Sequence, residues 1–303
     1  MEAPAARGGE RMRLRVVAVV VVLAMAAATA RAQLQVGYYD TLCPAAEIIV
    51  QQEGCDGSVL LDSTPGNQAE KDAAPNSSLR GFEVIDAAKT RLGEAGVVSC
   101  ADVLAFAARD ALALVGGSSY QVPAGRRDGN VSVAGETNGN LPPPTANVNQ
   151  LNQIFGSKGL SQAQMVALSG AHTVGMAQCS SFSSRLYSYG TNGGKDPSMD
   201  PAYLATLSTQ CPQSGASQPV AMDPVTPNTF DTNYYANVAA NRGLLASDQA
   251  LLADNSTAAQ VLGYTTSPGT FQTDFASAMV AMGAIGVLTG NQGTIRTNCR
   301  VVG

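Results

Sequence analysis

The stretch VSCADVLAFAARDALALVGG, residues 98–117, indicates the fold class because its apolar residues recur with a helical period. Ser99, followed three residues later by Asp102, is typical of a capping box at a helix start. The pair Gly116-Gly117 ends the pattern. The apolar residues that share one face are Val103, Ala107, Leu112 and Val115. The stretch therefore predicts a long amphipathic helix.

Helical periodicity continues on both sides of this stretch. Phe82, Ile85 and Leu92 form an apolar stripe. Ser161 and Gln164 form a second capping box, which opens a helix that Gly170 interrupts. Further helices are expected over 231–241 and 271–284, whereas 122–145 and 188–201 are rich in Gly, Pro and Asn and are predicted loops. The sequence predicts a mainly α protein with long loops.

Residues 1–32 have the pattern of a secretory signal peptide. A basic segment, RMRLR, precedes the apolar run VVAVVVVLAMAAATA, and Ala30-Arg31-Ala32 provides a cleavage site before Gln33. An uncleaved anchor is the alternative, but the run is shorter than the ~20 residues of a spanning helix. We therefore expect secretion to the extracellular space or apoplast, with no membrane attachment after cleavage.

The composition of residues 33–303 narrows the functional class. Residues 1–32 hold five Arg and two Glu of the 18 basic and 23 acidic residues, so the remainder has a net charge of −8, which argues against a nucleic-acid partner. These 271 residues suffice for a large core in one domain or in two closely packed lobes.

Three N-glycosylation sequons, which fit an exported chain, begin at Asn76, Asn130 and Asn255. Six cysteines in an exported chain favour disulfides, although 15 pairings are open.

The segment LSGAHTVGMAQC, residues 168–179, contains His172, the only histidine of the chain. A lone histidine is by default a structural residue. It can also be the axial ligand of a haem iron, because the porphyrin supplies four ligands and the protein only one. Such a ligand requires a carboxylate on its other ring nitrogen. Both interpretations remain open from the residues alone.

Ten motifs together resemble the secretory plant haem peroxidases, the class III peroxidases. They are GCDGSVLLD, EKDAAPN, RGFEVID, VVSCADVLAFAARDA, VPAGRRDG, NLPPP, MVALSGAHTVG, FDTNYY, RGLLASDQALL and TIRTNCRV, in the family's order and rough spacing over almost all of 33–303. The resemblance implies a two-lobed, mainly α fold with haem b between the lobes. It also implies a monomeric enzyme that reduces H₂O₂ and oxidises small phenolic donors, in peroxide removal, oxidative stress and cell-wall cross-linking.

The resemblance assigns roles to individual residues. His172 resembles the haem ligand, Asp248 the carboxylate that orients it, and Pro142 the position at the haem edge where donors bind. Two Ca²⁺ ions are implied, with oxygen ligands. The proximal set is matched in full by Thr173, Asp223, Thr226, Thr229 and Asp231. The distal set is matched in part by Gly54, Asp56 and Ser58, with Glu70 acting through water.

The chain departs from the family between Glu53 and Gly54. Relatives carry an arginine and a His-Asp-Cys-Phe motif on a helix at this point, and about 25 residues, close to seven helical turns, are absent here. The distal histidine and arginine are therefore missing, and no catalytic residue is identifiable on the distal side. Asn76 resembles the asparagine that orients the missing histidine. The runner-up hypotheses are a haem- and Ca²⁺-binding relative with impaired catalysis, and an incomplete gene model of an active peroxidase.

The missing segment also affects the disulfides that the resemblance implies. By resemblance, Cys100 pairs with Cys299 and Cys179 with Cys211. Cys43 and Cys55 have each lost the family partner. They can pair with each other across a short loop, or stay free or pair between molecules, and the sequence does not decide between these outcomes.

Overall fold

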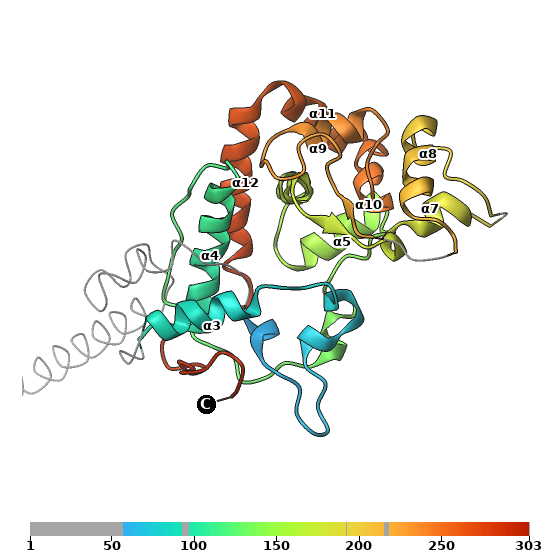
Figure 1. The fold of residues 1–303 in the computed structure, drawn as a ribbon. Coiled ribbons are helices and arrows are strands. Elements are labelled where there is room, and N and C mark those ends of the chain that lie inside the picture. The colour runs from blue at the N-terminus through green and yellow to red at the C-terminus, as the bar shows by residue number, and fades with distance from the viewer. Residues whose placement is uncertain (1–56, 93–96, 192, 215–217, 303) are drawn as a thin grey trace, which may run out of the picture.

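The computed structural model describes residues 57–92, 97–191, 193–214 and 218–302, and these residues form a mainly helical fold (Figure 1). Cys43, Cys55, Gly54 and Asp56 lie outside the described residues. The α-helices are α3 Phe82–Arg91, α4 Cys100–Leu114, α5 Val148–Ser157, α6 Gln162–Ser169, α7 Ser183–Tyr187, α8 Pro201–Gln210, α9 Asn233–Ala239, α10 Ala246–Gln249, α11 Asn255–Thr266 and α12 Pro268–Met282.

Short elements connect these helices. Strands β1 (Met176–Ala177) and β2 (Val220–Ala221) pair antiparallel, with Met176 opposite Ala221. The 3₁₀ turns are η1 Ser58–Leu60, η2 Glu70–Asp72, η3 Ala74–Asn76, η5 Ala134–Thr137, η6 Gly170–Thr173, η7 Cys179–Ser181 and η8 Ala250–Leu252. The predicted helices at 82–92, 231–241 and 271–284 correspond to α3, α9 and α12, with boundaries that differ by a few residues.

Helix α4 is the long amphipathic helix that the sequence predicts, and it joins two hydrophobic clusters. Val103 and Ala107 are fully buried in a cluster with α3. Leu112, five residues after Ala107, packs into a second cluster built from α5, α6, α9, α11 and α12. A single apolar stripe thus connects two parts of the core.

The start of α4 corrects one prediction. Ser99 caps the helix as expected, because its Oγ accepts the Asp102 N–H at 3.0 Å. The reciprocal half of the capping box is wrong: the Asp102 carboxylate turns away to accept the Gly125 N–H at 2.7 Å and pairs with the Arg126 guanidinium at 2.8 Å. The arginine and two backbone N–H groups, those of Gly125 and Arg126, give this carboxylate more partners than the single N–H that a capping box would offer.

A third cluster covers α7, α8 and the two strands. The disulfide Cys179–Cys211 lies in this cluster. The second disulfide, Cys100–Cys299, ties the start of α4 to the C-terminal segment across 199 residues of sequence. Both predicted pairings are confirmed.

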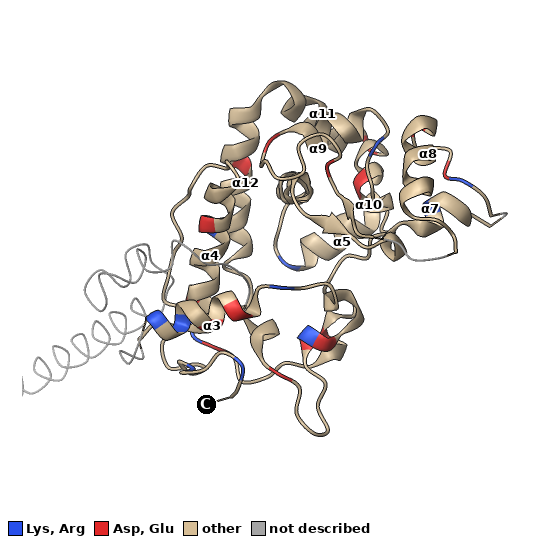
Figure 2. Cartoon of the chain, viewed as in Figure 1, with Lys and Arg blue, Asp and Glu red and all other residues tan. Residues whose placement is uncertain are grey.

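Charged residues are dispersed over the ribbon in Figure 2. Several of them form buried ion pairs, and in Arg185–Asp196, Arg296–Asp128 and Arg126–Asp102 no side chain is more than 8% exposed. Within the described part of the chain, no helix is both long and apolar enough to cross a bilayer.

Candidate functional site

His172 is positioned by the end of α6. After Ser169 the chain tightens into the 3₁₀ turn Gly170–Thr173. The Tyr235 hydroxyl lies within hydrogen-bond distance of the carbonyls of Val166 and Ala167, at 2.9 and 3.2 Å. These carbonyls belong to the last turn of the helix, where partners from the helix itself run out.

Gly170 is required by packing at this turn. A Cβ atom built on Gly170 would lie 2.5 Å from both the Phe271 ring and the Tyr235 hydroxyl. Glycine therefore lets α9 and α12 approach the turn that carries His172. The sequence identified Gly170 as a helix terminator, and the structure adds this packing role.

The imidazole of His172 is held by a buried carboxylate. Its Nδ1 lies 2.8 Å from Asp248 Oδ1, and the two side chains are 37% and 3% exposed. The same carboxylate accepts the Tyr234 hydroxyl on Oδ1 at 3.1 Å and the Leu245 N–H on Oδ2 at 2.8 Å. Asp248 is therefore fixed from three sides and cannot rotate away from His172 without losing two other bonds.

The electrostatics of this pair fit an iron ligand. The protein atoms around the ring oppose its protonation, but the charge of Asp248 and its hydrogen bond outweigh them and raise the pKa of His172. Burial, and next the charge of Asp248, keep the pKa of Tyr234 far above its usual value, so its hydroxyl remains a donor. With Nδ1 bonded to Asp248, Nε2 is the nitrogen left for a metal, and a carboxylate-bound imidazole is the usual form of an axial histidine.

The five residues expected at the proximal Ca²⁺ site come from one short region and one neighbouring turn. The Thr173 hydroxyl lies 3.3 Å from Asp223 Oδ2 and 3.2 Å from Asp231 Oδ1. Thr226 Oγ1 lies 3.3 Å from the same Asp223 oxygen. Thr229 is tied to this turn by its N–H, which donates to the Thr226 carbonyl at 3.1 Å.

This donor set suits a hard cation. One hydroxyl proton cannot serve two carboxylates, so Thr173 can donate to only one of Asp223 and Asp231 at a time, although both lie within hydrogen-bond distance of its oxygen. The carboxylates are also held by side-chain amides: Asn233 donates to Asp231, and Asn237 donates to Asp223. Two carboxylates and several neutral oxygens at this spacing are typical calcium ligands.

The distal Ca²⁺ residues are described only in part. Ser58 Oγ donates to Glu70 Oε2 at 2.8 Å, so these two predicted residues do meet. Gly54 and Asp56 fall outside the described residues. Among the described residues, no cluster of three or more His, Cys, Asp or Glu side chains is placed to hold a metal.

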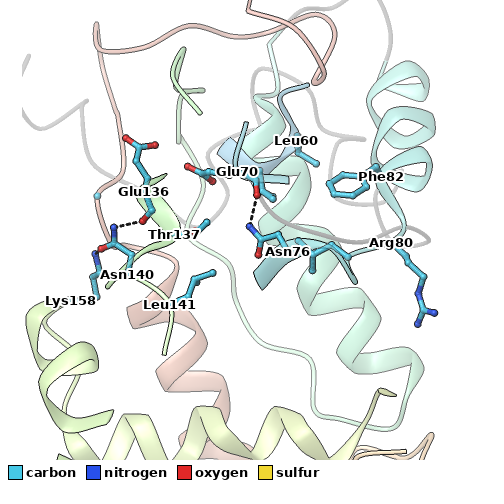
Figure 3. A pocket seen from close by; sticks show the side chains of 13 residues that line it. Leu60, Glu70, Asn76, Arg80, Phe82, Glu136, Thr137, Asn140, Leu141 and Lys158 are labelled. Atoms are coloured by element: carbon cyan, nitrogen blue, oxygen red, sulfur yellow. Dashed lines mark hydrogen bonds between the residues drawn. The ribbon is translucent and has the colours of Figure 1, made fainter. Parts of the chain in front are cut away.

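A cavity of about 660 Å³ is lined mainly by residues from the segments 59–82 and 136–141 (Figure 3). Leu60, Phe82 and Leu141 supply apolar surface, and Asn76 lines it while donating to the Glu70 carbonyl at 2.8 Å. Pro142, the expected donor position, is exposed and directly follows Leu141. The cavity therefore contains two residues of the expected distal side, Glu70 and Asn76, and adjoins the expected donor edge. His172 is not among its lining residues.

Comparison with known proteins decides the family. The sequence profile of the Peroxidase family matches residues 16–267. The chain belongs to this family, as a class III plant peroxidase. It is 52% identical to Peroxidase 5 of Vitis vinifera, over 89% of this chain and 92% of the relative. It is 43% identical to Peroxidase 3 of Arabidopsis thaliana, with 89% and 92% covered, and 45% identical to Peroxidase 1 of Zea mays, with 89% and 83% covered.

Membership gives the general activity and the cofactor class. The peroxidase is by family an oxidoreductase that uses haem to reduce H₂O₂. The mainly helical fold and both disulfides agree with this assignment.

Two residues close to Asp248, or to the segment that leads into it, were not predicted from the sequence. Tyr234, inside the motif FDTNYY, donates to Asp248, and only its place in that motif could have indicated a role. Arg185 is buried beside α10, yet in the sequence it is an ordinary arginine in a short helix. Its contacts join segments about 60 residues apart, which no local pattern reveals.

Proposed function

We propose that this peroxidase binds haem b through His172 Nε2, reduces H₂O₂ and oxidises small phenolic donors at the edge near Pro142. The contact that carries the proposal is the 2.8 Å pair between His172 Nδ1 and Asp248. Haem, when bound, supplies the redox chemistry of peroxide cleavage. The chain contributes His172 as the iron ligand, and Asp248 and Tyr234 orient it. It also contributes the cavity lined by residues 136–141.

The distal residues that assist peroxide cleavage are missing from this chain. Peroxide cleavage needs a base that takes a proton from one oxygen and returns it to the other, which is worth ~10²- to 10⁴-fold. His172 is the only histidine, so no second one is available for this proton transfer. The alignment to the grapevine relative runs over 301 positions but takes in only 89% of this 303-residue chain, which supports a segment that is present there and absent here. We therefore expect slow peroxide turnover.

The missing segment leaves two alternatives, and they lead to different outcomes. A catalytically impaired haem- and Ca²⁺-binding protein would bind haem and turn over no peroxide above free haem. An incomplete gene model would give a natural transcript that contains the distal helix. Sequencing the transcript across the codons for Gln52 to Cys55 separates these possibilities.

The further proposals concern calcium and location. We propose one complete Ca²⁺ site at Thr173, Asp223, Thr226, Thr229 and Asp231, and a partial distal site that includes Ser58 and Glu70. We also propose a secreted monomer that starts near Gln33. N-terminal sequencing and native mass of the secreted protein test this proposal, and an intracellular chain that retains residues 1–32 would contradict it.

The haem-ligand proposal is tested by replacing His172. The His172→Ala variant should lose haem uptake, measured as the Soret absorbance of the full chain titrated with haemin. Added imidazole should restore the absorbance, because it can fill the space left by the side chain. Normal haem uptake by the variant without imidazole would show that His172 is not the ligand.

A further inference from the structure

Arg185, in α7, is almost completely buried at 1% exposure. Its Nε donates to Asp196 Oδ2 at 2.7 Å, and Asp196 is held in turn by the Ser198 N–H and hydroxyl at 2.8 and 2.6 Å. A buried ion pair is weak evidence for stability, because desolvation of the two charges offsets their attraction. The other contacts of Arg185 point instead to a role in positioning a neighbouring segment.

The segment that Arg185 contacts is the one that leads into α10. Its Nη1 lies 2.5 Å from the Gly243 carbonyl, 2.9 Å from that of Leu244 and 3.1 Å from that of Leu245. All three contacts come from this one nitrogen, which has two N–H groups to share among them. Because the guanidinium is rigid and planar and its Nε is held by Asp196, the direction of these two N–H groups is fixed.

One peptide unit connects Arg185 to Asp248. The Leu244 carbonyl accepts from Arg185, and the N–H on the other side of the same planar, trans peptide belongs to Leu245 and donates to Asp248 Oδ2 at 2.8 Å. Rotation of that peptide would break both bonds together. The positive charge at the carbonyl also polarises the peptide and strengthens the N–H as a donor.

We propose that Arg185 is a positioning residue for the His172–Asp248 pair, acting through the Leu244–Leu245 peptide. Asp248 has two oxygens with different tasks: Oδ2 is fixed by Leu245, and Oδ1 faces His172. Loss of the guanidinium fork frees the peptide, lets the carboxylate turn and lengthens the bond to His172. The consequence for haem rests on the proposed function, whereas the consequence for the His172–Asp248 bond does not.

The test compares Arg185→Lys with a matched control, Arg126→Lys. Arg126 is also a buried arginine whose fork joins an aspartate, Asp102, to backbone carbonyls, here of Pro123 and Gly283, and it has no contact with α10. Both variants keep the charge and lose the fork. NMR of the full chain without haem measures two quantities: the hydrogen-exchange rate of the Leu245 amide and the chemical shift of the His172 Nδ1 proton. The second signal is unique because the chain has a single histidine.

In Arg185→Lys we expect about tenfold faster exchange at Leu245 and an upfield shift of the His172 proton. Arg126→Lys should leave both signals unchanged at a comparable loss of Tm. With haem bound, Arg185→Lys should also lose about tenfold in haem affinity and lower the iron–histidine stretching frequency. Ser198→Ala, which loosens Asp196 more gently, should shift both NMR signals in the same direction to a smaller extent.

Three results would overturn the inference. They are unchanged signals in both Arg185→Lys and Ser198→Ala, equal changes in Arg126→Lys, or a downfield shift of the His172 proton, which would mean a stronger bond to Asp248. If Arg185→Lys does not fold, Ser198→Ala decides alone. A wild-type chain that takes up no haem would contradict the proposed function, while the two NMR signals would still decide the role of Arg185.

Discussion

Thr173 shows how closely the two proposed cofactor sites are coupled. It is the residue after His172, is fully buried and points its hydroxyl at Asp223 and Asp231. A cation bound there would fix the turn that carries His172. A substitution of Thr173 therefore distinguishes a calcium site from a cluster of polar side chains that binds no metal.

We predict that Thr173→Val weakens the response of the protein to calcium. A ligand that binds only the folded state raises stability by mass action, so added Ca²⁺ should raise the Tm of the wild type and chelation should lower it. In Thr173→Val both shifts should fall to the part that the proposed distal site contributes, whereas Thr173→Ser, which keeps the hydroxyl, should retain both in full. Tm shifts of Thr173→Val as large as those of the wild type would remove Thr173 from the site.

The residue roles that could be predicted are those that belong to recognisable motifs. His172 and Asp248 lie 76 residues apart, and the structure joins them at 2.8 Å as the resemblance implied. The Asp102 capping interaction failed because a competing partner, Arg126, lies 24 residues away and a local pattern cannot contain it. The same reason hid Arg185. Gly54, Asp56, Cys43 and Cys55 stay predictions outside the described residues.

Among the elements, the turn from α6 into η6 depends most on a single residue type. Gly170 has ordinary helical backbone angles, φ −62° and ψ −12°, so glycine is needed there for space alone. Helices were predictable from period and caps, as Ser161 and Gln164 show at α6. The close approach of Tyr235 and Phe271 to Gly170 is a tertiary contact and had no signal in the sequence.

We predict opposite effects from two Gly→Ala substitutions. Gly170→Ala overpacks the turn and should lower the free energy of unfolding by about 1–3 kcal/mol. Gly263→Ala, within α11 where a Cβ meets nothing within 4 Å, should raise it by about 0.5–1 kcal/mol because alanine restricts the unfolded chain. Urea unfolding of both variants measures the pair, and equal effects would show that the space around Gly170 is not tight.

For the whole molecule, the two disulfides constrain loops of very different length. Cys100–Cys299 spans 199 residues and Cys179–Cys211 spans 32. The longer loop joins the start of α4 to the C-terminal segment, so it encloses the cores around α6, α9 and α12. The pairing was predictable from the family, whereas chain spacing alone left all pairings open.

We predict that replacing both cysteines of a pair with serine costs more for the longer loop. Loop-closure entropy gives about 5 kcal/mol for Cys100 with Cys299 and about 4 kcal/mol for Cys179 with Cys211. Denaturant unfolding of the two double variants under identical conditions gives the comparison. A larger loss from the shorter loop would mean that native contacts around Cys179, rather than chain entropy, dominate.

We propose that the chain keeps a complete proximal side and lacks the distal histidine and arginine. The most direct measurement is the rate of peroxide consumption by haem-loaded protein, compared with the same chain after insertion of the corresponding grapevine segment between Glu53 and Gly54. We predict that the chain as written reacts at least ~10²-fold more slowly than the restored chain. Equal rates, with His172-dependent haem uptake in both proteins, would contradict the claim.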